Sequence, residues 1–275
     1  MRQAAGVAPA DPTAPADLAL ALRLADAADA LSLPRFRAAD LRVERKPDRT
    51  PVTDADTAVE AALRALIAAE RPGDAVLGEE EGGGVPAAGR GWVLDPIDGT
   101  KNFSRGGAVW ATLIGLVVDG EVAVGVASAP ALGRRWWAAR GHGAWTCDAP
   151  GAAPRRIAVS GVRELGDAYV STTDLRTFTA QGRLQRWLDL TAACWETRAF
   201  GDFWQHCLVA EGVIDLAVDA AANPWDLAAL VPLLAEAGGA LTDLAGVAGF
   251  DGGDGLSSNG ALHAAALEHV GRSVV

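Results

Sequence analysis

The chain has 275 residues, of which 50% are hydrophobic and 21% charged, so it can bury a substantial core in one large domain or two closely packed ones. Its net charge of −11 argues against non-specific binding of nucleic acid, which requires a basic surface. No apolar run approaches the length that spans a bilayer, and three scattered cysteines indicate a reducing cytoplasm rather than a disulfide framework.

The chain begins with an Ala- and Pro-rich segment, residues 1–16. It lacks the basic start and apolar stretch of a signal peptide, so we interpret it as a disordered tail. The first helix is predicted from Asp17, a capping residue, to about Leu33, because Pro34 follows there. Its Leu and Ala residues are apolar nearly all round, which indicates burial between layers.

A second helix is predicted to begin near Asp54. Thr53 and Asp56 form a T-x-x-D pattern similar to a capping box, and apolar residues then recur at helical spacing. A short strand at Ala75–Leu77 leads into a glycine-flanked acidic loop that begins with Glu79. Composition alone favours a solvated loop, although this one follows a strand end just ahead of another acidic turn.

The next strand ends in that acidic turn. The apolar run 92–94 predicts a buried strand with Asp95 at its end, where Pro96 removes a ladder donor, and Asp98 follows on the same turn. Two carboxylates on one rigid turn raise each other's pKa unless a cation lies between them. Mg²⁺ takes carboxylate and phosphate oxygens, and Gly99 allows a tight turn that can cradle an anion. An acidic surface turn is the alternative.

Apolar segments separated by turn residues then predict an antiparallel meander as far as Trp145, with Asp119-Gly120 as a hairpin turn. These strands would form the first sheet, with the two early helices on its outer face. Gly151–Pro154 is expected to link an N-terminal α+β half, residues 17–150, to a C-terminal α/β half, residues 151–275.

The second half is predicted to alternate strands and helices. The principal elements are helices at Phe178–Leu190, Asp202–Ala210 and Leu227–Ala237, and a strand at Val213–Val218. Asp219 stands at the end of that strand. Asp226 stands at the N-terminus of the last helix, where the helix dipole stabilises its charge; a plain helix cap is the alternative role.

Four separated segments together resemble the inositol monophosphatase-like phosphatases, which are metal-dependent and lithium-sensitive. The segments are Lys46 with the T-D-x-D pattern, the G-E-E of the acidic loop, Trp92–Phe103, and Trp225-Asp226 with Glu236–Gly239. The resemblance runs from about Asp17 to His269. It implies an α/β fold, a layered αβαβα sandwich of the inositol monophosphatase and fructose-1,6-bisphosphatase type.

The resemblance also implies two to three Mg²⁺ ions, with Mn²⁺ as a substitute. Glu79, Asp95 and the Ile97 carbonyl would hold one ion. Asp95, Asp98 and Asp226 would hold a second, and a third, weaker ion would use Glu79 and water. The first ion would lower the pKa of a bound water and so create the nucleophile.

Further roles follow from the same resemblance. Thr100 and Asp54 resemble the pair that orients the water, and Glu79 belongs with them in the catalytic set. The N–H groups of Gly99 and Thr100, beside Asp98, would bind the phosphoryl oxygens. The reaction would be an in-line displacement without a covalent enzyme intermediate.

Two features point to a particular ester. Lys101 follows the motif threonine, and Gly201-Asp202-Phe203-Trp204 precedes a helix; together with residues 109–113 and 128–137 they resemble the actinobacterial-type histidinol-phosphate phosphatases. Histidinol phosphate carries an ammonium and an imidazole, so its pocket should contain carboxylates. We expect Asp202 and Asp219 to supply them, with capping or surface charge as the alternative.

Other functions remain open at this point. An inositol-1-monophosphatase or a nucleotide 3′-phosphatase would keep the same metal site and change only the pocket. A non-catalytic sensor of phosphate ligands is the alternative from another class. The expected partners are a small phosphate ester and, because the resembled family is often dimeric, a second copy of the chain, with neither nucleic acid nor membrane.

Overall fold

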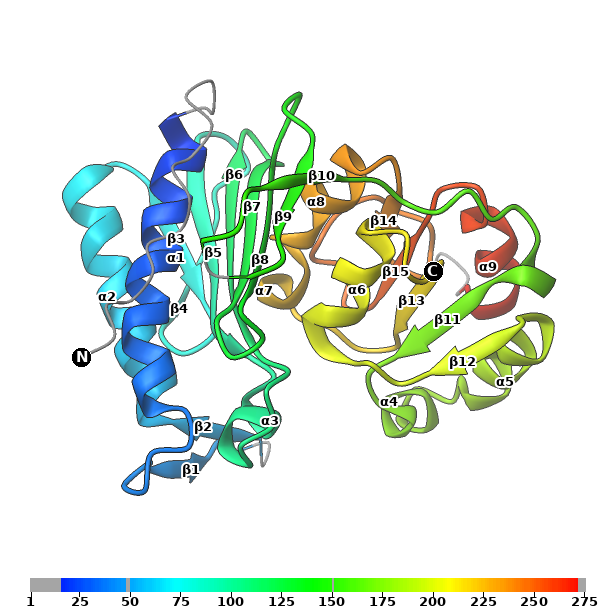
Figure 1. Ribbon diagram of the computed structural model, residues 1–275, viewed down its shortest axis with the longest axis horizontal. Helices are drawn as coiled ribbons and strands as arrows, with labels where there is room; N and C mark the ends of the chain where they lie inside the picture. The colour runs from blue at the N-terminus through cyan, green and yellow to red at the C-terminus, as the bar shows by residue number, and fades with distance from the viewer. Residues whose placement is uncertain (1–15, 48–49, 150, 272–275) are drawn as a thin grey trace.

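Two long helices, α1 (Ala16–Arg35) and α2 (Asp54–Glu70), cover the outer face of an eight-stranded sheet (Figure 1). The computed structural model describes residues 16–47, 50–149 and 151–271, so residues 1–15 of the predicted tail lie outside the described residues. At the start of α2, Thr53 and Asp56 form a capping box, as their spacing predicts.

The eight-stranded sheet is largely antiparallel. Its order is β10-β9-β8-β7-β6-β5-β3-β4, and β3 runs parallel to β5. The strands are β3 (Ala75–Gly78), β4 (Gly82–Gly83), β5 (Arg90–Asp98), β6 (Ala111–Val118), β7 (Glu121–Ala129), β8 (Arg134–Ala139), β9 (Ala144–Cys147) and β10 (Arg155–Ile157). A separate hairpin of β1 (Val43–Arg45) and β2 (Pro51–Thr53) lies beside the short helix α3 (Thr100–Ser104). The sheet thus continues in β10, beyond the predicted linker.

Strand β5 does not end at Asp95, contrary to the expectation from sequence. Asp95 pairs with Leu113 of β6, the register then shifts, and pairing resumes at Asp98. Pro96 cannot donate to the ladder, so it interrupts the pairing, and Thr112 Oγ1 donates a hydrogen bond of 2.8 Å to its carbonyl. The two aspartates are therefore carried on one continuous strand with an irregular step between them.

The second half contains a five-stranded sheet of order β12-β11-β13-β15-β14. Its elements are β11 (Tyr169–Thr172), α4 (Leu175–Ala180), α5 (Leu184–Ala193), β12 (Glu196–Arg198), α6 (Asp202–Ala210), β13 (Leu216–Asp219), α7 (Pro224–Leu227), α8 (Leu230–Glu236), β14 (Ala240–Thr242), β15 (Gly255–Ser258) and α9 (His263–Val270), with a 3-10 turn at Leu165–Asp167. The single helix predicted at residues 178–190 is two helices, because Gly182 takes a left-handed conformation (φ 67°) between them.

Five layers result, in the order helices, sheet, helices, sheet, helices, which confirms the predicted αβαβα architecture (Figure 1). One apolar cluster joins α1 and α2 to the large sheet. A second fills the space between the large sheet and α6 and α8, and a third joins the smaller sheet to α4, α5 and α9. In the described part of the chain, no helix combines the length and apolar character needed to cross a membrane.

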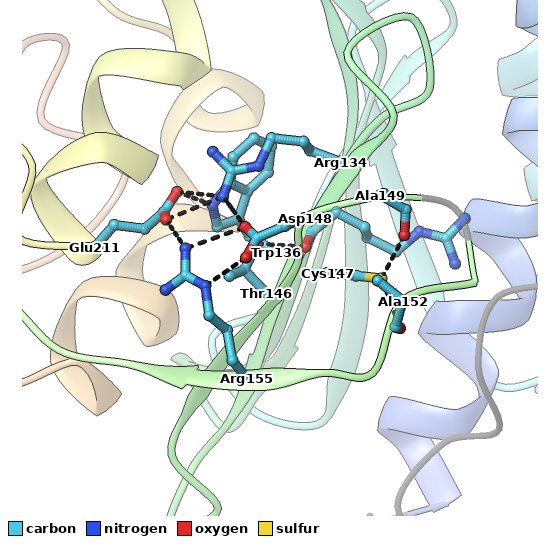
Figure 2. Close-up of polar contacts among 10 residues, drawn as sticks. Arg134, Trp136, Thr146, Cys147, Asp148, Ala149, Ala152, Arg155 and Glu211 are labelled. Atoms are coloured by element: carbon cyan, nitrogen blue, oxygen red, sulfur yellow. Dashed lines mark hydrogen bonds and ion pairs between the residues drawn. The ribbon is translucent and has the colours of Figure 1, made fainter.

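A buried carboxylate, Glu211, joins the middle helical layer to the large sheet. It lies at the end of α6 with its side chain 3% exposed, and it accepts hydrogen bonds from Arg134 (2.9 Å), Trp136 Nε1 (2.7 Å) and Arg155 (Figure 2). Asp148 pairs with both arginines. The arginines come from β8 and β10, so this one carboxylate ties α6 to two strands of the first sheet.

We expect Glu211→Ala to lower the free energy of unfolding by about 2–4 kcal/mol, because it leaves Arg134 and Trp136 Nε1 without a buried acceptor. The loss should stay below the upper end of the range for a broken buried ion pair, because Arg155 is half-exposed and water can solvate it. Urea denaturation measures the change. The control is Glu121→Ala, which removes the exposed ion pair with Arg140 and should cost about 0–1 kcal/mol. Equal losses in the two variants would contradict the role given to Glu211.

Candidate active site

A cavity of about 360 Å³ opens where the two halves meet. Its floor comes from the end of β5 and from α3, and its walls come from the loop after β11 and the N-terminal ends of α6 and α7. It is lined by Thr50, Pro51, Glu79, Asp95, Ile97, Asp98, Gly99, Thr100, Lys101, Asn102, Thr173, Asp174, Ala199, Phe200, Gly201, Asp202 and Asp226. Six of these are acidic and one is basic, so the cavity is strongly negative.

Three carboxylates converge at the base of this cavity. Asp95, Asp98 and Asp226 each place an oxygen within 4.8 Å of the others. The first two come from β5, and the third comes from the first turn of α7, where it accepts a hydrogen bond from the Asn223 N–H. Their distant positions in the sequence therefore meet in one cluster, as the resemblance implies.

The cluster has the donor chemistry of a site for a hard divalent ion. All the donors are oxygen atoms, and Asp95 Oδ1 is buried without a hydrogen-bond partner among the described residues. Burial, followed by the charges of Glu79 and Asp98, raises the pKa of Asp95. Burial and then Asp202 raise the pKa of Asp98, and burial raises the pKa of Asp226 to about 7. A bound cation would remove this repulsion, so the residues fit such an ion.

Glu79 lines the same cavity but lies outside the group of three. Its Oε1 accepts a hydrogen bond of 2.7 Å from the Lys46 ammonium, which also reaches Glu80 at 2.8 Å. Lys46 thus gives Glu79 a cationic partner within the chain, which the sequence did not indicate. Both carboxylates face the ammonium from the turn between β3 and β4.

The partner of Thr100 differs from the one expected. Its hydroxyl lies 3.2 Å from Asp56 Oδ1 and 2.9 Å from the Ile97 carbonyl, whereas Asp54 pairs with Arg35 at 2.8 Å. Asp56, and not Asp54, is therefore the aspartate paired with Thr100, contrary to the Thr100–Asp54 pair that the resemblance implies. The capping box predicted from the sequence carries the reason: its third helical residue, Asp56, turns back toward the helix start, whereas the first, Asp54, pairs with Arg35.

Asp202 reaches the cavity from the N-terminus of α6. Its Oδ2 accepts a hydrogen bond of 3.0 Å from Asn102, and its N–H donates to Thr173 Oγ1 at 2.9 Å. Its backbone is left-handed, with φ 48°. Burial, followed by the charge of Asp219, raises its pKa to about 6. The next residue, Phe203, donates its N–H to Asp98 Oδ2 at 2.7 Å, so α6 supports the acidic cluster directly.

Asp219 is not among the described residues that line the cavity. Both of its oxygens lie 2.9 Å from Gln205 Nε2, and Oδ2 also lies 2.9 Å from His206 Nε2. Gln205 Nε2 in turn lies 3.0 Å from Thr173 Oγ1. Asp219 therefore stands behind α6 and connects to Asp202 through Gln205 and Thr173.

The profile described as the inositol monophosphatase family matches residues 16–274. A histidinol-phosphatase of Mycobacterium tuberculosis is 55% identical over 90% of this chain and 95% of its own, and one of Streptomyces coelicolor is 50% identical over 90% and 94%. The structure of an inositol monophosphatase from Zymomonas mobilis is 33% identical, covers 92% of this chain and 97% of its own, and superposes with a TM-score of 0.80.

We expect Mg²⁺ to raise the melting temperature, because an ion that binds only the folded chain stabilises the folded state. At a Mg²⁺ concentration of about a hundred times Kd, the free energy of unfolding should rise by about 2.7 kcal/mol. Asp95→Asn should remove most of this shift. Asp189→Asn, at an exposed position of α5 and outside the residues that line the cavity, should keep it. Thermal unfolding with Mg²⁺ and with a chelator measures both. A full shift in Asp95→Asn would argue against the cluster as the binding site.

Proposed function

The chain belongs to the inositol monophosphatase family, and we propose that it is a Mg²⁺-dependent phosphatase that hydrolyses L-histidinol phosphate to L-histidinol and inorganic phosphate. The choice of substrate rests on the sequence identity to two histidinol-phosphatases, which is 55% and 50% over 90% of the chain. The acidic cavity supports the same choice, because the ester carries cationic groups beside its phosphate.

The metal sites in this proposal follow the carboxylates of the cavity. Asp95, Asp98 and Asp226 would hold one ion, and Glu79 with Asp95 and the Ile97 carbonyl would hold another. Mg²⁺ suits the all-oxygen set, and Mn²⁺ would also fit. When bound, such ions lower the pKa of a coordinated water and balance the charge that develops on the phosphoryl group.

The protein's own groups would orient the attacking water. The single proton of Thr100 Oγ1 has two acceptors, the Ile97 carbonyl at 2.9 Å and Asp56 at 3.2 Å. If the carbonyl holds an ion as proposed, the proton would go to Asp56, and Thr100 Oγ1 would accept a hydrogen bond from the water and turn its lone pair toward phosphorus. Asp56 is held by the Thr53 backbone N–H at 2.8 Å, which fixes the geometry of the pair. The N–H groups of Gly99 and Thr100 stand at the start of α3 without intrahelical partners and would bind the phosphoryl oxygens.

Asp202 is our candidate for the group that reads the cationic part of the substrate. It lines the cavity beside Asp98, and Asn102 fixes its side chain. A charge-assisted hydrogen bond from the substrate ammonium would contribute about 1.5–3 kcal/mol. In this proposal Asp219 does not contact the substrate. It accepts a hydrogen bond from Gln205, which also contacts Thr173, and Thr173 accepts the N–H of Asp202.

The test of the function is phosphate release from a panel of esters: histidinol phosphate, inositol 1-phosphate, fructose 1,6-bisphosphate, adenosine 3′,5′-bisphosphate and glycerol phosphate. We expect the highest kcat/KM for histidinol phosphate. In excess chelator, we expect no hydrolysis of this ester. Asp202→Asn should lower that kcat/KM about ten- to a hundredfold and change the value for glycerol phosphate much less. A higher kcat/KM for another ester would replace histidinol phosphate as the substrate, and equal losses on both esters would give Asp202 a structural role.

We expect Asp56→Asn to lower kcat by about a hundredfold or more, because an amide oxygen can accept a hydrogen bond from Thr100 but cannot take up a proton, so general-base assistance to the water is lost. Asp54→Asn is the matched control: it is the same change two residues away on the same helix, and it should stay within about threefold of wild type. Steady-state kinetics at saturating Mg²⁺ compare the two. A larger loss in Asp54→Asn would reverse the assignment.

A further inference from the structure

One face of α2 carries three charged side chains at helical spacing, Asp56, Glu60 and Arg64. Asp56 and Glu60 are both 0% exposed, beside apolar neighbours such as Val59 and Leu63. Residues four apart lie on the same side of a helix, so the three form a continuous polar ridge. Asp56 contacts Thr100, as described above, whereas Glu60 and Arg64 contact another part of the site.

Glu60 holds the turn that carries Glu79. Its Oε2 accepts the N–H of Glu80 at 2.8 Å, and its Oε1 accepts the N–H of Glu81 at 3.0 Å. Arg64 donates to Glu60 Oε1 at 2.9 Å and to the Gly82 carbonyl at 2.6 Å. The pair therefore binds both the donors and an acceptor of the turn between β3 and β4.

Gly78, the residue before Glu79, has no side chain and so leaves room for the Glu60 carboxylate. A Cβ on Gly78 would lie 2.2 Å from Glu60 Oε1, so no side chain fits there while Glu60 keeps its place. On the other side, the Glu79 N–H donates to the Leu94 carbonyl at 3.2 Å, next to Asp95. Glu79 is thus held between Glu60 and β5.

We propose that Glu60 is a positioning residue that sets the Glu79 side chain for ion binding. The inference rests on the proposed role of Glu79 as a metal ligand. Burying a carboxylate costs free energy unless its oxygens are paired, and here both Glu60 oxygens are paired with donors of the turn and with Arg64. A carboxylate presents two acceptors in one plane, and that is what two successive turn N–H groups require.

The test is ion binding in the absence of substrate, using Mn²⁺ as the probe and the whole chain. Glutamine has the shape of glutamate but presents an amide donor to one of the two N–H groups. Glu60→Gln should therefore raise the Kd for Mn²⁺ about tenfold, the range for groups that orient metal ligands. At saturating ion, kcat should stay within about threefold of wild type, so the defect lies in ion affinity rather than in the chemical step.

Asp74→Asn is the matched control. Asp74 lies at the opposite end of β3, its side chain is 7% exposed, and it accepts hydrogen bonds from Trp92 Nε1 (2.9 Å) and Arg90. This variant should lose stability without a change in the Kd for Mn²⁺. A wild-type Kd in Glu60→Gln, or the same rise in Asp74→Asn, would overturn the inference.

Two further variants separate the possible failures. If Glu79→Gln binds Mn²⁺ as tightly as wild type, the proposed ligand role of Glu79 fails; if Glu79→Gln is weakened and Glu60→Gln is not, only the positioning role fails. If Glu60→Gln does not fold, Gly78→Ala replaces it, because its added methyl displaces the Glu60 carboxylate from the other side. A folded Gly78→Ala with wild-type Kd would overturn the inference.

Discussion

The mutual repulsion of buried carboxylates is the constraint on which the rest of this structure depends. Asp95, Asp98 and Asp226 lie in a cavity lined by six acids, and burial together with the neighbouring charges raises the pKa of each. Such a cluster persists only if rigid elements hold it and its charge is neutralised, by a bound cation or by protons. The step in β5, the α6 N–H at Asp98 and the first turn of α7 supply the rigidity.

The candidate site takes residues from both halves of the chain, so the contact between the halves sets the distances between its acidic groups. Asp95 and Asp98 belong to the first sheet, whereas Asp226 and Asp202 belong to helices that lie between the two sheets. Glu211 ties the far end of α6 to the first sheet, at the opposite end of the helix from Asp202. A helix fixed at both ends holds its first residues at a constant distance from β5.

The family resemblance predicted the layers and the convergence of distant acids, whereas caps, strand ends and turn residues predicted most of the individual elements, because these are local signals. Prediction from sequence failed where tertiary contacts decide. The register shift that carries β5 past Asp95 needs Thr112 of the neighbouring strand, and the split at Gly182 depends on a backbone conformation. The choice of Asp56 over Asp54 needed the direction of each side chain on the helix. Strands β14 and β15 and helix α9 were missed, because their sequences are short and lack clear periodicity.

The left-handed backbone at Asp202 has a consequence for how such a cavity can diversify. Aspartate, asparagine and glycine tolerate that conformation, whereas β-branched and bulky residues are strained in it. An exchange among those three residues changes the charge and size at the cavity wall without straining the backbone of α6. If Asp202 reads the ligand as proposed, single substitutions at this one position would change ligand preference while the backbone of α6 stays as it is.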